Sequence, residues 1–447
     1  MKIKICLFIL FAFLSVPAGS QTSALIGYWH NWNDAAAPYV MLDQIDSRYN
    51  TICVSFAVPV SPSDMTMLFT PDVVSQSTFI SQVQTLQSQG KKVLISIGGA
   101  NTSISLNNTA NRDAFINSMT SILNTYHFDG IDIDIEHGNS ILASGTIANP
   151  TSADCINLIY AINQIKTNYF IANNRQMMLT FAPETAYVQG GMSAYGGIWG
   201  GYLPLIHAFR NDLNSVHVQL YNSGSMYGID GYIYSQGTAD FILAMSEALI
   251  HGFNTAGGYF QGLPANKVAV GLPACPNAAG GGFVSTATVQ SAVKYLRGSG
   301  PKPGTYTLTQ TGGYPNLGGM MTWSINWDKV TTCNATPYEY AQNYQQLFNS
   351  PLSINNHEKI NDYKLYQNFP NPFNPSTSIN YEIPESGNVK VTILDALGRE
   401  VETIVNEYHS SGLYSIDWNA SQFSSGVYFC KLKTKNFTDV KRMLLVS

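Results

Sequence analysis

Charged residues are scarce in this chain of 447 residues. They make up 11 % of it, and 23 Lys+Arg against 28 Asp+Glu leave a net charge of -5 at pH 7. A broad phosphate-binding surface needs clustered basic side chains, so this composition argues against one. The polar surface must consist mostly of Ser, Thr, Asn and Gln, which suits an extracellular protein with an uncharged polymeric substrate. A hydrophobic content of 45 % excludes global disorder.

Cysteine is also rare, with six in the whole chain. Five remain once Cys6 is removed with the leader predicted below: Cys53, Cys155, Cys275, Cys333 and Cys430. Five thiols allow at most two disulfides, and no CxxC pair or Cys/His cluster has the spacing of metal ligands. We therefore expect neither a zinc site nor a disulfide scaffold.

Long hydrophobic runs are missing except near the N-terminus. Lys2 and Lys4 precede a run over residues 5–16 that is apolar except for Ser15, and small residues follow before Gln21. This pattern predicts a cleaved signal peptide over residues 1–20. A membrane anchor is the alternative, but about a dozen apolar residues are too few for a bilayer that needs about 20. We expect no membrane span in the mature chain.

Between residue 24 and about residue 349, short runs of β-branched or aromatic residues alternate with longer segments whose apolar residues have helical spacing. This alternation is typical of repeated βα units. Eight runs are of the first kind: residues 24–29, 51–57, 92–97, 130–136, 177–182, 216–221, 267–272 and 320–325. Helical spacing covers residues 79–86, 114–123, 155–165, 241–250 and 289–296. An open doubly wound sheet would need a glycine fingerprint after its first strand, which is absent. The sequence predicts an α/β fold, a (β/α)8 TIM barrel over residues 21–350.

After Pro351 the sequence becomes rich in Asn, Pro and Ser. Residues 351–362 are predicted to form a short linker. Beyond them, short alternating runs separated by turn residues cover 389–394, 404–405, 412–418 and 426–432. This pattern predicts a small all-β sandwich domain over residues 363–447.

The candidate chemistry lies in the predicted strand 130–136, where acids alternate with isoleucines. Asp132, Asp134 and Glu136 must share one face of this strand, and in a barrel that face can line the interior. Carboxylates about 6 to 7 Å apart with little water cannot all ionise, so at least one proton should remain near neutral pH. The proton belongs to the coupled set, and Glu136, nearest the carboxyl end, is the candidate general acid.

Two alternatives remain for this strand. A solvated polar strand would still need a core for its isoleucines. Stacked acids could also chelate a divalent cation, but no His or further acid cluster is obvious elsewhere in the sequence. We therefore predict no metal site here.

The four acids Asp129, Asp132, Asp134 and Glu136 match the pattern DxxDxDxE, and residues 24–349 resemble the chitinases of glycoside hydrolase family 18. Three further segments resemble motifs of that family in the same order: Ser96-Ile97-Gly98-Gly99, Gln219-Leu220-Tyr221-Asn222 and Trp323. Residues 135–138 look like the compact plant-type and bacterial members.

The resemblance implies a retaining, substrate-assisted glycoside hydrolysis without a cofactor, in which the 2-acetamido group of the substrate is the nucleophile. Glu136 would protonate the glycosidic oxygen, and Asp134 would orient the acetamido group. Asp132 would tune Asp134 by sharing a proton, and Tyr221 would hydrogen-bond the acetamido oxygen. These four residues are the expected catalytic set.

Substrate contacts are expected from six residues: Trp323 as the apolar floor under the sugar ring, with Tyr28, Gln219, Asn222, Phe56 and Gly99. The segment from residue 273 to 319 must hold a helix, which leaves little room for the α+β insertion that deepens the cleft of some relatives. We therefore expect an open groove and endo-acting cleavage. The family also has non-proline cis peptides where Ser55-Phe56 and Trp323-Ser324 fall.

The tail resembles a different family. Residues 368–375 (NFPNPFNP), 394–401 (LDALGREV) and 425–428 (SGVY) resemble the C-terminal sorting domain read by the type IX secretion system. The resemblance implies a secreted or cell-surface protein with the secretion machinery as a partner. A carbohydrate-binding sandwich is the alternative, although Trp418 is the only tryptophan in this region.

Three functions stay open from the sequence. The first is a secreted endo-chitinase acting on β-1,4-linked N-acetylglucosamine. The second is an endo-β-N-acetylglucosaminidase that trims N-glycans with the same fold and acid. The third is a chitin-binding lectin, a kind of protein that has usually lost the acid or its partner, whereas Asp134, Glu136 and Tyr221 are all present here. No nucleic-acid partner is expected.

Overall fold

A computed structural model of the chain describes residues 23–136, 141–348, 362–409 and 412–446. The predicted signal peptide and nearly all of the predicted linker lie outside these residues. The chain divides into two compact units, residues 1–352 and residues 353–447, and each is described by itself. In the described part of the chain, no helix combines the length and the apolar character that crossing a membrane requires.

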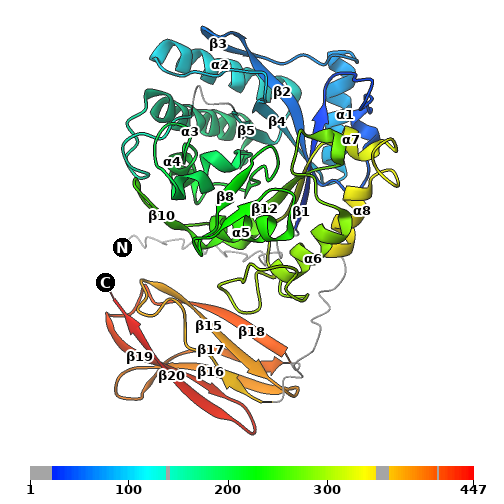
Figure 1. Cartoon of the computed structure of the whole chain (residues 1–447). Coiled ribbons are helices and arrows are strands. Elements are labelled where there is room, and N and C mark those ends of the chain that lie inside the picture. The colour runs from blue at the N-terminus through cyan, green and yellow to red at the C-terminus, as the bar shows by residue number, and fades with distance from the viewer. Residues whose placement is uncertain (1–22, 137–140, 349–361, 410–411, 447) are drawn as a thin grey trace, which may run out of the picture. The chain divides into compact units, whose positions relative to one another are not determined.

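The first unit is built on eight parallel strands, several of which are labelled in Figure 1. Their order in the sheet is β12-β13-β1-β2-β4-β5-β6-β7. Their bounds are β1 (Ala24–His30), β2 (Thr51–Ser61), β4 (Lys92–Gly98), β5 (Gly130–Asp134), β6 (Met178–Phe181), β7 (Ser215–Val216), β12 (Ala269–Pro273) and β13 (Gly319–Trp323). Parallel bridges from Val216 to Val268 and from Gln219 to Gly271 join the two ends of this order. The predicted (β/α)8 barrel is confirmed, with all eight strands near their predicted places.

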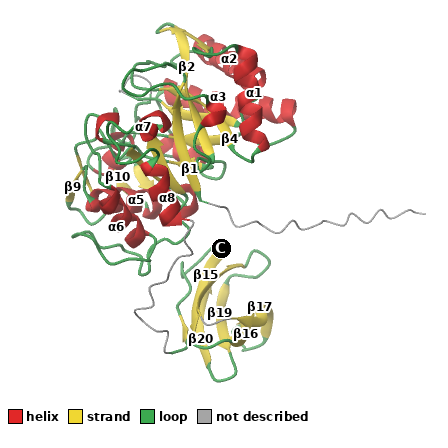
Figure 2. Ribbon diagram, turned by 90° about the vertical axis from the view of Figure 1, so that its right-hand side faces the viewer, coloured by secondary structure: helices red, strands yellow, loops and turns green. Residues whose placement is uncertain are grey.

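Helices surround the barrel strands, as the red ribbons around the yellow strands show (Figure 2). Their bounds are α1 (Gln76–Ser88), α2 (Thr109–Tyr126), α3 (Ala153–Asn173), α4 (Leu203–Phe209), α5 (Ala239–His251), α6 (Thr286–Leu296), α7 (Ile325–Lys329) and α8 (Glu339–Phe348). The five predicted helical stretches lie inside α1, α2, α3, α5 and α6. Each of these helices begins at a Ser, Asn or Thr whose side chain accepts a backbone N–H of the first turn.

Short antiparallel strand pairs lie outside the eight parallel strands. Strand β3 (Asp64–Leu68) pairs with the outer half of β2. Two hairpins pair β8 (Ser225–Tyr227) with β9 (Ile233–Ser235) and β10 (Phe253–Thr255) with β11 (Gly258–Phe260). A disulfide between Cys275 and Cys333 links the loop after β12 to the loop after α7.

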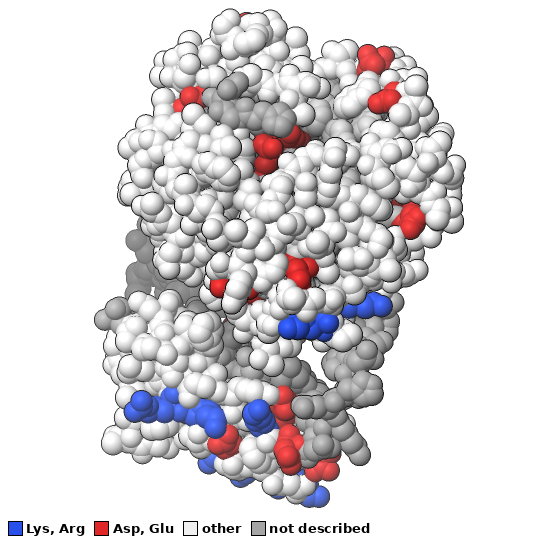
Figure 3. All heavy atoms as spheres, viewed as in Figure 1, with Lys and Arg blue, Asp and Glu red and all other residues white. Residues whose placement is uncertain are grey.

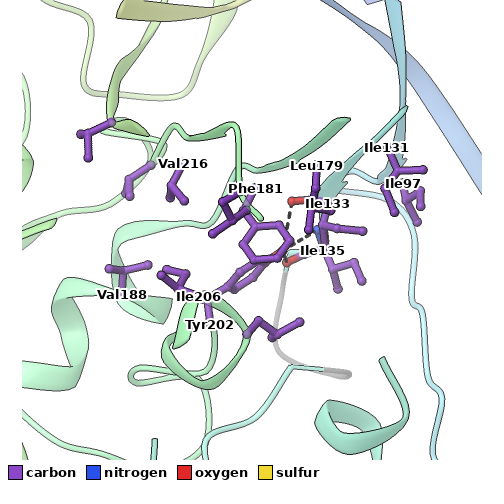
Figure 4. Close-up of a cluster of buried hydrophobic side chains, with 14 of the residues drawn as sticks. Ile97, Ile131, Ile133, Ile135, Leu179, Phe181, Val188, Tyr202, Ile206 and Val216 are labelled. Carbon is purple, nitrogen blue, oxygen red and sulfur yellow. Dashed lines mark hydrogen bonds between the residues drawn. The ribbon is translucent and has the colours of Figure 1, made fainter. Parts of the chain in front are cut away.

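The alternation of side chains along the barrel strands separates two apolar cores. On β5 and just beyond it, Ile131, Ile133 and Ile135 belong to the large core between strands and helices, where they pack near Leu179 and Phe181 (Figure 4). The barrel interior holds a much smaller apolar cluster, made of Ile26, Tyr28, Cys53, Ala182, Ala269 and Met321. The acids of β5 therefore take the inward positions, as the sequence pattern predicts.

The predicted strand over residues 130–136 is two residues too long. Strand β5 ends at Asp134, because the next backbone N–H, that of Ile135, donates to the Tyr202 hydroxyl at 2.9 Å and not to a neighbouring strand. The prediction for residues 216–221 is also too long, since regular pairing of β7 stops at Val216 and only isolated bridges continue. Both strands end early at the rim where the candidate site lies.

The second unit contains two antiparallel sheets. One has the order β14-β15-β18 and the other β17-β16-β19-β20. Their bounds are β14 (Lys364–Leu365), β15 (Ser376–Ile383), β16 (Gly387–Leu394), β17 (Glu400–His409), β18 (Gly412–Asn419), β19 (Gly426–Lys433) and β20 (Thr438–Leu445). Every second residue of β15 is buried, and these side chains share one core with Val391, Ile393 and Leu432 of the other sheet. The predicted all-β sandwich is confirmed.

Gly98 provides a test of how the fold positions the acid strand. Its φ of +114° is unfavourable for other residues, and an added Cβ would lie 2.3 Å from the backbone oxygen of Asp134. We expect Gly98→Ala to lower the free energy of unfolding by about 2 to 4 kcal/mol in denaturant titrations. Gly90→Ala is the matched control: its φ is +81° with nothing within 4 Å of an added Cβ, so about 1 kcal/mol is expected. Equal losses would contradict the close approach.

Candidate active site

Strand register brings polar side chains together in the barrel interior at the level of Asp132. Ser96 on β4 and Thr180 on β6 are the direct neighbours of Asp132 across the sheet. The same inward alternation places Tyr28 of β1 and His217, just after β7, in this layer. A fully buried carboxylate is therefore surrounded by groups that can donate hydrogen bonds.

Asp132 accepts hydrogen bonds on both oxygens. Tyr28 and Ser96 donate to Oδ2 at 2.6 and 2.8 Å, and Thr180 donates to Oδ1 at 2.6 Å, where the His217 Nε2 also lies at 3.3 Å. Burial alone would raise the pKa of Asp132, but the interactions with His217, Thr180 and Tyr28 hold it below its ordinary value. Asp132 is therefore an anion inside the barrel.

Asp134 lies one layer closer to the carboxyl ends of the strands and behaves in the opposite way. Burial first, then the charges of Glu136 and Asp132, raise its pKa well above the ordinary value, and a hydrogen bond with Glu136 adds to this. The Gln219 amide donates to Asp134 Oδ1 at 2.8 Å and to Glu136 Oε1 at 3.1 Å. A proton is thus retained near neutral pH by the coupled pair of Asp134 and Glu136.

The sequence predicts that the coupled acids retain at least one proton and that Glu136 acts as the general acid. In the structure, Asp134 is nearly fully buried and its pKa is raised, and Glu136 lies partly buried at the end of the stack. Because the two carboxyl groups share a hydrogen bond, the proton can pass from Asp134 to Glu136 without crossing water. The pair can therefore deliver it at the exposed end.

Tyr221 is buried close to this pair. Burial, then the charges of Asp134 and Glu136, raise its pKa well above 10, so its hydroxyl stays neutral and can donate. Asn222 adopts a left-handed φ of 53° and binds the neighbouring loop, with its Oδ1 3.1 Å from the backbone N of Gly281. An added Cβ on Gly282 would lie 2.6 Å from the Tyr221 Cα. Asn222 thus fixes the loop that packs on Tyr221.

Aromatic rings form one wall of the candidate site. The rings of Phe56 and Trp323 are partly buried and stack at 5.9 Å with an interplanar angle of 13°. Tyr28 lies against both rings, but it is buried and its hydroxyl is bound to Asp132, so it supports the site from below. The His30 ring stacks on Trp32 at 4.6 Å and lies tilted against Trp323 at 4.9 Å. The peptides Ser55-Phe56 and Trp323-Ser324 are both cis, as the resemblance implies.

Two residues of the family pattern hold the backbone. Gly99 donates its N–H to the backbone oxygen of Asp134 at 2.7 Å, and a Cβ added to Gly99 would collide with the Phe56 ring. Asp129 accepts from the backbone N of Val93 and from Arg175, which fixes the start of β5 against β4. Both hold the backbone of the acid strand against β4.

Three residues around the acids are not predicted from the sequence. Thr180 and His217 occupy inward positions of predicted strands, so the alternation that revealed Asp132 could have flagged them. Tyr202 precedes the short helix α4, and its hydroxyl binds the N–H and C=O of Ile135 at 2.9 and 3.0 Å (Figure 4). No periodic pattern in the sequence predicts that contact.

One cluster of the described residues has the composition of a metal site. Cys53, Asp132 and His217 offer ligand atoms within 4.8 Å of one another, and all three are buried. The donor set does not fit a cation, because both oxygens of Asp132 already accept hydrogen bonds and burial raises the pKa of the Cys53 thiol well above its ordinary value. Asp132 and His217 belong to the polar layer of the barrel interior, and Cys53 packs in the apolar cluster beside it.

A buried carboxylate, a protonated carboxyl pair and a stacked aromatic wall at the carboxyl ends of barrel strands define the class of (β/α)8 glycoside hydrolases. Residues 24–369 match the family described as Glycosyl hydrolases family 18, and the chain belongs to that family. Residues 367–446 match the Secretion system C-terminal sorting domain, so the protein is secreted or displayed at the cell surface.

Similar proteins agree with this assignment. Chitinase D of Niallia circulans is 48 % identical over 323 residues, which are 71 % of this chain and 61 % of that protein. Endochitinase 37 of Trichoderma harzianum is 35 % identical over 70 % of this chain and 87 % of its own length. The crystal structure of a family GH18 chitinase from Chromobacterium violaceum has a TM-score of 0.64 at 36 % identity, covering 73 % of this chain and 83 % of that chain. The chain thus spans about three fifths of the length of Chitinase D.

The opposite pKa shifts of Asp132 and Asp134 predict opposite effects on stability. A carboxyl with a raised folded pKa lowers stability as pH rises above its unfolded pKa of about 3.9, whereas one with a lowered folded pKa stabilises above that pH. We expect Asp134→Asn to raise the thermal midpoint at pH 7 and Asp132→Asn to lower it, each by about 2 °C or more. Both differences should shrink toward pH 3. Shifts of the same sign for both variants would contradict the charge assignment.

Proposed function

We propose that this protein is a secreted endo-chitinase that hydrolyses β-1,4-linked N-acetylglucosamine with retention of configuration. The observation that carries the proposal is the inward stack of Asp132, Asp134 and Glu136. Asp132 is the anion at the inner end, and the pair of Asp134 and Glu136 holds a proton toward the carboxyl ends of the strands. The family assignment and the names of the similar chitinases support it.

Glu136 is the proposed general acid. It lies at the partly exposed end of the stack, where a glycosidic oxygen can approach, and it shares the proton of Asp134. Protonation of the leaving oxygen and attack of the substrate's own acetamido oxygen at the anomeric carbon give an oxazolinium ion. Water then opens this ion from the face that the leaving group occupied, so no protein nucleophile is required.

Asp134 and Asp132 are proposed to stabilise that intermediate. Once Asp134 has passed its proton to Glu136, its carboxylate can accept the acetamido N–H and stabilise the positive charge. Asp132, buried behind it, supplies a fixed negative charge. The Gln219 amide holds Asp134 and Glu136 in one arrangement, so we assign it a positioning role in place of the substrate contact expected from the sequence.

The sugar ring is proposed to lie on Trp323, whose indole is held in place by Phe56, Tyr28 and His30. The C–H face of a pyranose packs well on an indole. Tyr221 is proposed to donate its neutral hydroxyl to the acetamido oxygen and hold it in the geometry of attack.

Endo-acting cleavage is supported by the segment between β12 and β13. It holds the 3-10 turn Pro276–Ala278 and the helix α6, and no strand lies between β12 and β13 among these described residues. No α+β insertion therefore walls the groove at this point. The face of the barrel unit seen in Figure 3 also carries few charged side chains, which suits a neutral polymer.

The two alternative functions have less support. An endo-β-N-acetylglucosaminidase would share fold and mechanism, but the similar proteins reported above are named as chitinases. A lectin would not need the protonated pair that Asp134 and Glu136 form.

Glu136→Gln tests the acid. We expect kcat on chitin oligomers to fall by about 1000-fold or more because the proton donor is lost, with oligomer binding retained. Product lengths from a long oligomer measure the mode of cleavage, and internal cuts are expected. Near-normal turnover by Glu136→Gln would overturn the assignment, and release of glycans from a glycoprotein without chitin turnover would favour the endo-β-N-acetylglucosaminidase.

Deletion of residues 363–447 tests the sorting domain. Because the two units have separate cores, we expect chitin turnover per molecule to stay unchanged. In a host with type IX secretion, the truncated protein should remain in the periplasm, as cell fractionation would measure. Export at the normal level would refute the sorting role.

A further inference from the structure

His217 is a fully buried histidine in the barrel interior that the mechanism above leaves without a role. Its Nε2 lies 3.3 Å from Asp132 Oδ1 and 3.4 Å from the Tyr28 hydroxyl oxygen. It is too deep to touch a substrate. Any effect it has on the reaction must therefore pass through the groups it contacts, Asp132 and Tyr28.

The neighbours of the imidazole decide which ring nitrogen carries hydrogen. The Tyr28 hydroxyl already donates its hydrogen to Asp132 at 2.6 Å, so only oxygen lone pairs face the His217 Nε2. A bare Nε2 would place its own lone pair against a carboxylate, which is repulsive. Nε2 must therefore carry the hydrogen and donate it, while Nδ1, buried, has no hydrogen-bond partner among the described residues.

We propose that His217 is a positioning residue that keeps Asp132 ionised by donating its Nε2–H to Oδ1, and that this anion keeps the working proton on the Asp134–Glu136 pair. The proposal rests on the proposed function. With His217, both oxygens of Asp132 have two donors each: Tyr28 and Ser96 on Oδ2, Thr180 and His217 on Oδ1.

The link from Asp132 to the reacting pair is electrostatic. The charge of Asp132 is one of the causes that raise the pKa of Asp134. If Asp132 became protonated, Asp134 would hold its proton less tightly and the stack would lose its anion. The working form of the site therefore needs an ionised Asp132 below a protonated pair.

The titratable groups around the imidazole come from three strands. Asp132 and, one layer further out, Asp134 belong to β5, Tyr28 to β1 and Cys53 to β2. Burial raises the pKa of both Tyr28 and Cys53 well above the ordinary values, so these two groups stay neutral at working pH. Asp132 is then the group in contact with His217 whose ionisation the histidine can govern.

Two variants separate the donated hydrogen from the volume of the ring. His217→Met fills similar space without a donor, and His217→Gln can place an amide N–H near the position of Nε2. The pH profile of kcat on a soluble chitin oligomer is measured for both. For His217→Met we expect the acidic limb to move up by about one pH unit, because Asp132 then takes up a proton more easily. The alkaline limb and KM should not change, and His217→Gln should return most of the shift.

The outcomes are distinguishable from a purely structural role. A loss of kcat that is equal at every pH, a profile identical to wild type, or His217→Gln behaving like His217→Met would overturn the proposal. If His217→Met does not fold, His217→Asn replaces it, because its shorter side chain cannot reach Asp132 while that of Gln can. Failure of the wild-type protein to hydrolyse the oligomer would instead refute the proposed function.

Discussion

The structure depends on keeping one carboxylate charged inside the barrel. A buried carboxylate without partners would be neutral, because desolvation of the charge costs far more than protonation. Asp132 avoids this through hydrogen-bond donors from β1, β4 and β6 and through the His217 imidazole, just after β7, whose Nε2 lies 3.3 Å from Oδ1. Four different segments of the barrel thus converge on two oxygen atoms, and the closure of the barrel is what brings them together.

This anion divides the acid strand into two different environments. Asp132 is satisfied by donors and stays ionised, while Asp134, 3 % exposed, meets two acids and retains a proton. Glu136 lies beyond the end of β5, where the Tyr202 hydroxyl replaces a neighbouring strand as partner of the backbone. The same alternation of residues therefore yields an ionised carboxylate, a carboxyl group that retains a proton and a partly exposed proton donor within five positions of the chain.

Much of this follows from the sequence. The alternation of acids and isoleucines predicts which side chains face the barrel interior, and the spacing of βα units predicts the barrel. The hydrogen-bond partners of Asp132 could not be predicted, because Tyr28, Thr180 and His217 come from strands whose register is set only when the barrel closes. The contact of Tyr202 is not predictable for a similar reason, since α4 is a short helix held by tertiary packing. The predicted strands are longer than β5 and β7 because contacts at the carboxyl-terminal rim of the barrel, and not strand propensity, decide where these strands end.

The stereochemistry of the first product tests the central claim most directly. Hydrolysis of a chitin oligomer is followed by proton NMR within the first turnovers, before the reducing end equilibrates. Attack by the substrate's own acetamido group, with Asp134 and Glu136 in the roles assigned above, predicts that the new reducing end appears as the β anomer. A new reducing end that appears as the α anomer would require direct attack by water and would contradict the account.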